Sequence, residues 1–158
     1  MLHAELDIKG IVAAVAKANG RLAVNIPHAL SLCADLVAVE SKTTHEYTDR
    51  SGVLTNSIMA DEVMGSFGAD LSVAVGAGAP YGTSIEFGAK PHKIKPKFRK
   101  ALRWPVEGGF AFAGEVNHPG NRAYSFLSNA LQKQLPEIGG VMEDATILSF
   151  AQAGFGVE

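Results

Sequence analysis

The sequence predicts an α+β fold, with a small antiparallel β-sheet flanked by a long N-terminal helix and a C-terminal helix. Three observations favour this class: helical periodicity in the first third of the chain, period-two alternation with many turn signals in the middle, and a second helical pattern near the end. The chain has 158 residues, of which 47% are hydrophobic and 19% charged. We therefore expect a single domain, residues 1–158, with its own core.

The first third of the chain carries two helical patterns. Residues 11–16 form a short apolar face, which Gly20 is expected to break or cap. The pattern resumes from Ile26 to Tyr47, where Pro27 suits a first helical turn because its missing N–H has no partner there. Residues 1–48 are accordingly expected to form a helical N-terminal part.

Composition limits the compartment and the class of protein. Cys33 is the only cysteine, so neither an internal disulfide nor a Cys-rich zinc site is expected, and its apolar helical position predicts a buried, inert thiol. Residues 1–10 lack the basic region of a signal peptide, and the apolar run that follows is too short to span a membrane. These features predict a protein made in the cytoplasm, without membrane contact.

The middle of the chain reads as short β-strands. A turn signal at residues 49–52 precedes a candidate strand beginning at Val53–Met59. Leu71–Gly76 alternates larger with small residues, and the Gly-rich residues 65–70 fit a hairpin connection between the two strands. Ile85–Phe87 is expected to be a short element closed by a glycine.

Two further strands are predicted at Ala101–Val106 and Gly109–Ala113. Glu107 and Gly108, followed by a second glycine, give a tight hairpin signal between them. Residues 50–131 therefore contain the predicted β-rich core and the start of the last helical region.

The end of the chain predicts two helices. Tyr124–Gln134 has an apolar face, Pro136 and Gly139–Gly140 are expected to interrupt it, and Val141–Phe150 is expected to form a last helix. Residues 136–158 are treated as a C-terminal extension.

Half of the positive charge lies in one segment, residues 90–103, which we call the basic ribbon. The formal charge of the whole chain is only −2, so the ribbon is a local feature of a near-neutral protein. Lysines alternate with Ile, Pro and Phe over Lys93–Phe98, which predicts lysines on one face and apolar groups on the other. Pro91 and Pro96 cannot donate to a β-ladder, so we expect an edge strand or an extended arm. The cations of the ribbon are Lys90, Lys93, Lys95, Lys97, Arg99, Lys100 and Arg103.

The basic ribbon has three interpretations. Its lysines can protect an edge strand from pairing with other sheets, bind acidic groups of a partner protein, or contact nucleic-acid phosphates. Phe98, within the ribbon, and Trp104, directly after it, are the only Phe, Tyr or Trp residues nearby, which is few for a stacking platform on single strands. The solvated or partner-facing interpretation is therefore favoured over a nucleic-acid-binding module.

Sequence motifs for catalysis are not found. The five histidines lack the spacing of a helical zinc site, and no G-x-S-x-G nucleophile motif occurs. Gly76–Gly78 lacks the continuation of a phosphate-binding loop. His118 lies in the turn-like segment Asn117–Gly120, and a small hydrolase using His118 with a nearby acid is kept as an alternative. We expect no enzymatic activity, no cofactor and no metal.

Five segments in chain order resemble motifs of one protein family, and together they cover about half of the chain. Their motifs are TG-x-L-x-x-S-I, PYA-x-x-x-EFG, PH-x-I-x-P followed by ALRF, V-x-HPG, and PFL-x-x-AL. In this chain they correspond to Arg50–Ile58, Tyr81–Gly88, Pro91–Trp104, Val116–Gly120 and Phe126–Leu131. The family is that of the head–tail joining or tail-completion proteins of long-tailed bacteriophages, which are neck or minor tail components. Ser51 replaces a frequent Thr, Ser125 replaces the usual Pro, and no motif matches beyond Leu135.

The resemblance implies a structural virion protein that forms a ring between the head connector and the tail tube, assembled in the bacterial cytoplasm. A six- or twelve-fold homo-oligomer is implied, with neighbouring connector, tail-terminator or tail-tube proteins as partners and DNA passing through the lumen. A tail terminator is the alternative within the same class. The basic ribbon would then contact neighbouring subunits, or less favourably the passing DNA. The residues that carry the resemblance as structural motifs are Tyr81, Glu86, Phe87, Gly88, Pro91, His92, His118, Pro119, Gly120, Phe126 and Leu127.

Overall fold

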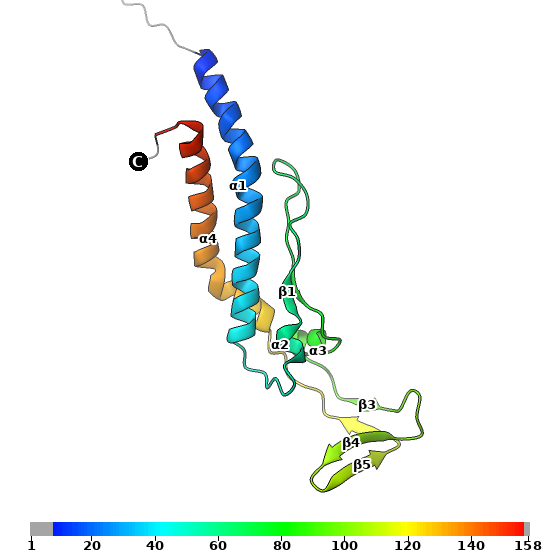
Figure 1. Ribbon diagram of the computed structural model, residues 1–158. Helices are drawn as coiled ribbons and strands as arrows, with labels where there is room; N and C mark the ends of the chain where they lie inside the picture. Colours follow the sequence, from blue (N-terminus) through cyan, green and yellow to red (C-terminus); the bar gives the residue numbers. More distant parts are fainter. Residues whose placement is uncertain (1–7, 157–158) are drawn as a thin grey trace, which may run out of the picture.

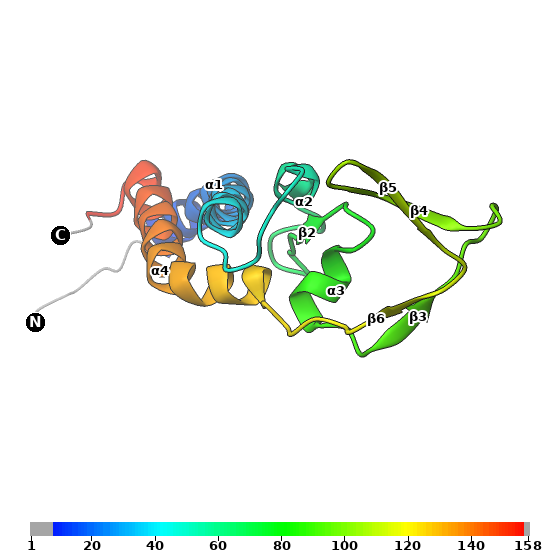
Figure 2. The same ribbon diagram turned by 90° about the horizontal axis from the view of Figure 1, so that it is seen from below.

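The computed structural model describes residues 8–156 and has an α+β fold, as predicted. Two long helices, α1 (Ile8–Thr43) and α4 (Phe126–Ala153), lie side by side and antiparallel (Figure 1). The β structure consists of three two-stranded antiparallel ladders rather than one sheet. One ladder packs beside α1, and the other two form an extension that points away from the helices (Figure 2).

Small residues allow α1 and α4 to approach closely. Ala29, Cys33 and Ala34 of α1 are buried, as is Ser149 of α4, whose hydroxyl accepts a hydrogen bond of 2.9 Å from the Asn25 side chain of α1. The helical pair therefore combines close backbone packing with polar links along its length.

A second polar link lies at the other end of the pair. Lys133 Nζ lies 2.6 Å from Glu40 Oε1, and Gln134 donates a hydrogen bond of 3.0 Å to the same carboxylate. The hydrogen bond from Lys133 is the main reason that the pKa of Glu40 is lowered from its ordinary value. These bonds fix α4 against the last turns of α1.

The predicted break in the N-terminal helix is wrong. α1 runs without interruption through Gly20, and Pro27 lies in its interior rather than in a first turn. An interior Gly costs about 1 kcal/mol and an interior Pro about 3 kcal/mol, so packing against α4 outweighs both penalties. Tyr47, assigned to the helix by its periodicity, lies beyond the helix end and turns into the core.

By length and composition α1 is also apolar enough to cross a membrane, although one such helix is weak evidence for a membrane span. Mostly buried core helices and signal sequences near an N-terminus pass the same test, and 28% of the apolar window of α1 is buried, where it packs along α4 and β1. The absence of membrane contact remains a prediction.

The predicted interruption of the C-terminal helix is also wrong. α4 is one helix with Pro136 and both Gly139 and Gly140 inside it. It bends between its yellow first turns and its orange-red remainder (Figure 1), as expected when a proline removes a backbone hydrogen bond and crowds the preceding turn.

The first β-ladder joins β1 (Ile58–Ala60) to β2 (Val75–Ala77), with Ile58 opposite Ala77. The predicted strand from Val53 is wrong at its start, because Val53–Asn56 forms the short helix α2. The second predicted strand begins later than expected, and Ser72 makes only an isolated bridge to Met64. Residues 58–77 thus form a hairpin that extends beside α1, which we call the long hairpin (Figure 1).

The core lies where the helices, the long hairpin and α3 (Gly82–Phe87) meet. Leu54, Ile58 and Phe126 are each 1% exposed, and the Tyr47 ring packs edge-on against Phe126 with centroids 5.2 Å apart. The segment predicted only as a short element, Ile85–Phe87, is the end of α3. This core positions the extension described next.

Four strands build that extension, which we call the arm (residues 90–118). β3 (His92–Ile94) pairs with β6 (Val116–His118), and β4 (Leu102–Val106) pairs with β5 (Gly109–Ala113). The last two strands match their predicted positions to within one residue. Gly108 has φ +82° in the connecting turn, a conformation that glycine adopts without strain.

Candidate interaction surface

The root of the arm is closed by one backbone pair. Ala89 and Asn121 donate to each other's carbonyl oxygens, each bond being 3.0 Å long. Gly88 and Gly120 flank this pair, and both have positive φ values near 80°. A Cβ on Gly120 would lie 2.1 Å from the Ala89 oxygen, so only glycine fits between the two backbone segments of the root.

Glu86 ties the root to the long helices. Its carboxylate is buried and accepts hydrogen bonds from the backbone N–H groups of Leu127 and Ser128, at 2.9 and 3.1 Å, and from the Ser128 hydroxyl at 2.6 Å. These are the second and third residues of α4, whose N–H groups have no partner within the helix. Ser125, at the N-cap position, makes no capping bond with its own side chain. Glu86 therefore caps α4 from α3, 41 residues earlier in the chain.

The first family-like motif also has a structural role. Asp49 accepts hydrogen bonds from the backbone of Gly52 (2.8 Å) and Thr55 (3.0 Å) and from the Thr55 hydroxyl, which holds α2 in place. The hydrogen bond from the Thr55 hydroxyl is the main reason that the pKa of Asp49 lies below its ordinary value. Ser57 Oγ donates to the Leu54 carbonyl at 2.8 Å and accepts from the Ala79 N–H at 3.0 Å.

The two histidines of the motifs lie opposite each other in the β3–β6 ladder. His92 and His118 stack with ring centroids 5.0 Å apart. His118 Nδ1 accepts a hydrogen bond of 3.0 Å from the Gly120 N–H, and His92 Nδ1 lies 2.9 Å from the Lys90 carbonyl oxygen. Both rings therefore hold the backbone at the root of the arm. Absence of catalysis remains a prediction.

The other motif residues divide between the core and the surface. Phe126 is buried and Leu127 packs against the core beside it. Tyr81 precedes α3 and is 43% exposed, while Phe87 is 74% exposed. The prolines Pro91 and Pro119 are exposed at the root.

The seven cations of the basic ribbon do not form one surface with one role. Lys93 and Lys95 both pair with Glu115, at 2.7 and 3.3 Å, across the β3–β6 ladder. Arg103 lies over the Phe110 ring, 3.6 Å from its centroid. Within residues 8–156, no acidic side chain is in ion-pair range of the remaining four. These unpaired cations are Lys90, Lys97, Arg99 and Lys100.

Lys93 and Lys95 lie on one face of the ribbon, since both pair with Glu115, but the apolar residues between them are not buried. Ile94 is 37% exposed and Phe98 is 97% exposed. Among the elements that the structure describes, β3 and β6 contact chiefly each other. The expectation of an extended arm is nevertheless confirmed by the path of residues 90–118 away from the helices (Figure 2).

The β4–β5 hairpin exposes apolar side chains on both faces, a feature that the sequence analysis missed. Trp104, Val106, Phe110 and Phe112 are between 38% and 66% exposed. Among the described elements, β4 and β5 pack chiefly against each other. The aromatic content of the two strands was the signal that the sequence offered, because a hairpin this rich in aromatic residues in a small domain normally packs on a core or a partner.

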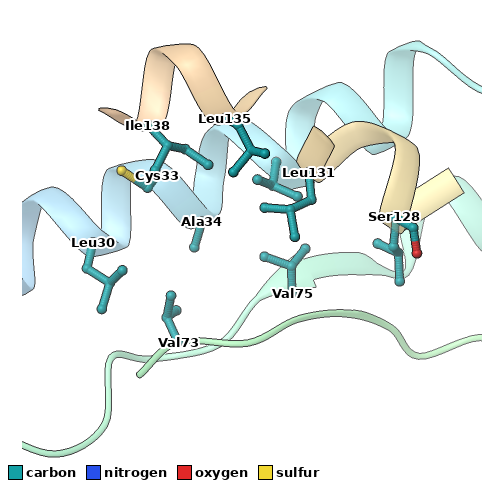
Figure 3. A pocket seen from close by; sticks show the side chains of 11 residues that line it. Leu30, Cys33, Ala34, Val73, Val75, Ser128, Leu131, Leu135 and Ile138 are labelled. Atoms are coloured by element: carbon teal, nitrogen blue, oxygen red, sulfur yellow. The ribbon is translucent and has the colours of Figure 1, made fainter. Parts of the chain in front are cut away.

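An apolar groove lies outside the arm, among the long helices and the long hairpin. It has a volume of about 400 Å³ and lies between α1, α4 and the β2 end of the long hairpin. Leu30, Val73 and Leu131 face the same space from these three elements (Figure 3). Leu131 and Leu135 on its α4 side are 44% and 48% exposed, so the groove is open to solvent.

Metal chemistry gains no support from the geometry. Within the part of the chain that the structure describes, no three His, Cys, Asp or Glu side chains are grouped to hold a metal ion. Cys33 is buried in the helical pair as predicted, and this burial raises the pKa of its thiol. A raised thiol pKa disfavours the reactive thiolate.

Comparison of the chain with protein-family models, with curated proteins and with solved structures yields no match.

Proposed function

We propose that this chain is a structural subunit of a homo-oligomeric ring in the neck of a long-tailed bacteriophage, where it joins the head connector to the tail. The observation that carries the proposal is the arm. Its root is fixed by backbone pairing and by two glycines that admit no side chain, yet its outer hairpin exposes aromatic residues on both faces. Such a hairpin is suited to packing on another subunit.

The energetics favour a closed assembly over an isolated pair. Burying one large, fully exposed apolar side chain contributes about 1.5–3 kcal/mol, and the four hairpin residues are only 38–66% exposed, so burying the remainder contributes roughly 3–6 kcal/mol. Association costs roughly 4–15 kcal/mol in lost translational and rotational freedom. One arm contact alone is therefore at best marginally stable. When a ring closes, it gains one more arm contact than an open chain with the same number of subunits, and no subunit loses further translational freedom. The closed ring is therefore more stable than its open fragments.

The link to a phage neck rests on the order of the motifs and on what their residues do here. Leu54, Glu86, Gly120 and Phe126 build the core, cap α4 and close the arm root. A family that shares these residues would therefore share a rigidly based arm. Virion location, a six- or twelve-fold stoichiometry and contacts with connector or tail-tube proteins belong to this proposal, with a tail terminator as its variant.

Nucleic-acid binding is the second candidate, supported by the four unpaired cations and the fully accessible Phe98 ring. It is less favoured because Glu115 already engages Lys93 and Lys95. If the ribbon binds DNA, changing Lys97, Arg99 and Lys100 to Ala weakens binding and lowers its salt dependence. Unchanged affinity in this variant, or no binding near physiological salt, would exclude this candidate.

The main test removes the arm without disturbing its root. Ala89 and Asn121 form the kind of doubly bonded pair that flanks a two-residue hairpin turn, so residues 90–120 can be replaced by Asn-Gly. The wild-type chain should form rings in negative-stain images and a multiple of the subunit mass in native mass spectrometry. The armless variant should be a folded monomer by circular dichroism and mass.

Two results would contradict the proposal. The first is a wild-type chain that stays monomeric at all concentrations, including when mixed with candidate connector and tail-tube proteins. The second is a ring that forms equally well from the armless variant. Particle images that label the chain outside the neck would reject the phage location while leaving self-assembly intact.

A further inference from the structure

The long hairpin differs in charge from the arm. Between Arg50 and Lys90 the chain contains no Lys, Arg or His, and the long hairpin carries three acidic residues, Asp61, Glu62 and Asp70. All three are exposed. The arm, by contrast, carries seven Lys and Arg against two acidic residues.

Two of these acidic residues lie on the segment next to the groove wall. The backbone N–H of Asp61 donates a hydrogen bond of 2.8 Å to the Ala74 carbonyl, and Ala74 lies between the groove residues Val73 and Val75. The hairpin side of the groove is therefore lined by valines with the acidic segment behind them, and its other side is lined by α1 and α4 (Figure 3).

The arm of the same chain does not occupy this groove. Figure 2 shows the arm on the far side of α2 and α3 from α1 and α4, and its root is fixed in that direction by the Ala89–Asn121 pair. A matching arm must come from elsewhere. The arm presents exposed aromatic side chains next to unpaired cations, and the groove presents exposed aliphatic side chains next to exposed carboxylates.

We infer that the groove between α1, α4 and the long hairpin receives the arm of a second copy of this chain. The apolar residues of the β4–β5 hairpin lie against Leu131 and its neighbours, and the cations of residues 97–100 approach the acidic segment that carries Asp61 and Glu62 beside the groove. The inference rests on the proposed ring and names its interface. Because arm and groove are different surfaces, the contact is heterologous and repeats head to tail, which closes a ring when the rotation permits.

Two variants test the arm side and the groove side of the interface separately. The arm variant carries Phe98→Ser and Phe112→Ser, both at exposed positions. The groove variant carries Asp61→Lys and Glu62→Lys, whose side chains take part in no hydrogen bond or ion pair that the structure records within residues 8–156. A charge-matched control reverses the adjacent, exposed acids Glu143 and Asp144 on α4.

The measurement is the mass distribution by analytical ultracentrifugation at protein concentrations where the wild type assembles. Each variant alone should associate at least tenfold more weakly than the wild type, and the control should assemble normally. An equimolar mixture of the two variants should form a one-to-one dimer and nothing larger, because it contains one intact arm and one intact groove in complementary copies. Circular dichroism confirms that each variant is folded.

The outcomes distinguish the interface from the ring itself. If the groove variant and a Leu131→Glu variant assemble like the wild type while the arm variant does not, the arm docks elsewhere and the inference is wrong, although the ring proposal stands. The inference is also wrong if both variants lose assembly but their mixture forms no dimer. A wild-type chain that never assembles removes the inference and the proposed function together.

Discussion

Replacing Glu86 with Ala should destabilise the fold more than any comparable change at an exposed acid. The Glu86 carboxylate is 5% exposed and accepts three hydrogen bonds, two of them from N–H groups at the start of α4. Removing it leaves those donors without a partner in a largely buried setting.

The size of the effect follows from these bonds. A buried donor left without a partner costs about 1–3 kcal/mol, and the loss of a favourable charge at a helix N-terminus adds about 0.3–1 kcal/mol. Partial entry of water into the first turn of α4 offsets some of this cost. We expect the free energy of unfolding to fall by about 3 kcal/mol in Glu86→Ala. A chain of this size should then melt about 6–12 °C lower.

Glu86→Gln provides a graded comparison. Its amide oxygen can still accept a hydrogen bond from Leu127, but its amide nitrogen is a donor and faces the donors of Ser128. We expect a loss of about 1–2 kcal/mol. Exposed Glu137, on the same helix, is the control, and its replacement by Ala should change stability by less than about 0.5 kcal/mol.

The assay is urea unfolding followed by far-ultraviolet circular dichroism, at one fixed protein concentration because the proposed self-association would contribute to apparent stability. A Glu86→Ala variant within about 0.5 kcal/mol of the wild type would refute the capping role. So would equal losses for Glu86→Ala and Glu137→Ala.

Three further predictions concern the arm root and the α2 segment. Gly120→Ala should cost about 2–4 kcal/mol in urea unfolding, because its Cβ would collide with the Ala89 oxygen, whereas Gly108→Ala, with a similar φ but open space, should cost only about 1 kcal/mol; equal costs would contradict the steric argument. Because the pKa of Asp49 is lowered in the folded protein, its carboxylate stabilises the fold at pH values above its ordinary pKa of about 3.9. This contribution is lost as the pH falls through the lower pKa of the folded state. The stability difference between the wild type and Asp49→Asn should therefore shrink with acidification in denaturant titrations, and a constant difference would rule out this linkage. Replacing residues 90–120 with Asn-Gly should leave the melting temperature of the body within a few degrees, measured by circular dichroism, and an unfolded product would show that the arm supports the core.

The parts of the fold that could be predicted from the sequence are those fixed by nearby residues. β4 and β5 were located to within one residue because Gly108 and Gly109 define the turn between them locally. The long helices were recognised from their periodicity, which reports the face that each buries.

The errors have two physical causes. Gly20 and Pro27 are unfavourable in an isolated helix, but the contact with α4, more than 100 residues later, keeps α1 continuous, and local propensity cannot report this contact. The strand expected at Val53 is a helix because the Asp49 carboxylate accepts hydrogen bonds from the N–H groups of the following turn. This second interaction is local, and the acidic residue before the turn was a signal that the sequence analysis missed.

The candidate site was only partly visible in the sequence. The charge of the basic ribbon and its extended path were predicted, but the pairing of Lys93 and Lys95 with Glu115 depends on the register of β3 against β6. The role of Glu86 was also missed, because its partners lie 41 and 42 residues later. Alternation predicted that Ile94 and Phe98 lie apart from the lysines, but it could not report that both stay exposed in the described part of the chain.

Two of the three uses considered for the lysines of the ribbon are compatible in the proposed ring. Before assembly, the unpaired cations around Phe98 would repel other arms and so discourage hairpin-to-hairpin pairing, which is the protective role of charge on exposed strands. In the proposed ring, the same cations would meet the exposed carboxylates of the long hairpin of a neighbour, where repulsion is replaced by attraction. The aromatic residues then supply most of the contact energy, while the charges decide which surface they reach. Assembly should therefore lose specificity before it loses affinity as salt is raised, because screening weakens the charges and leaves the apolar contact in place.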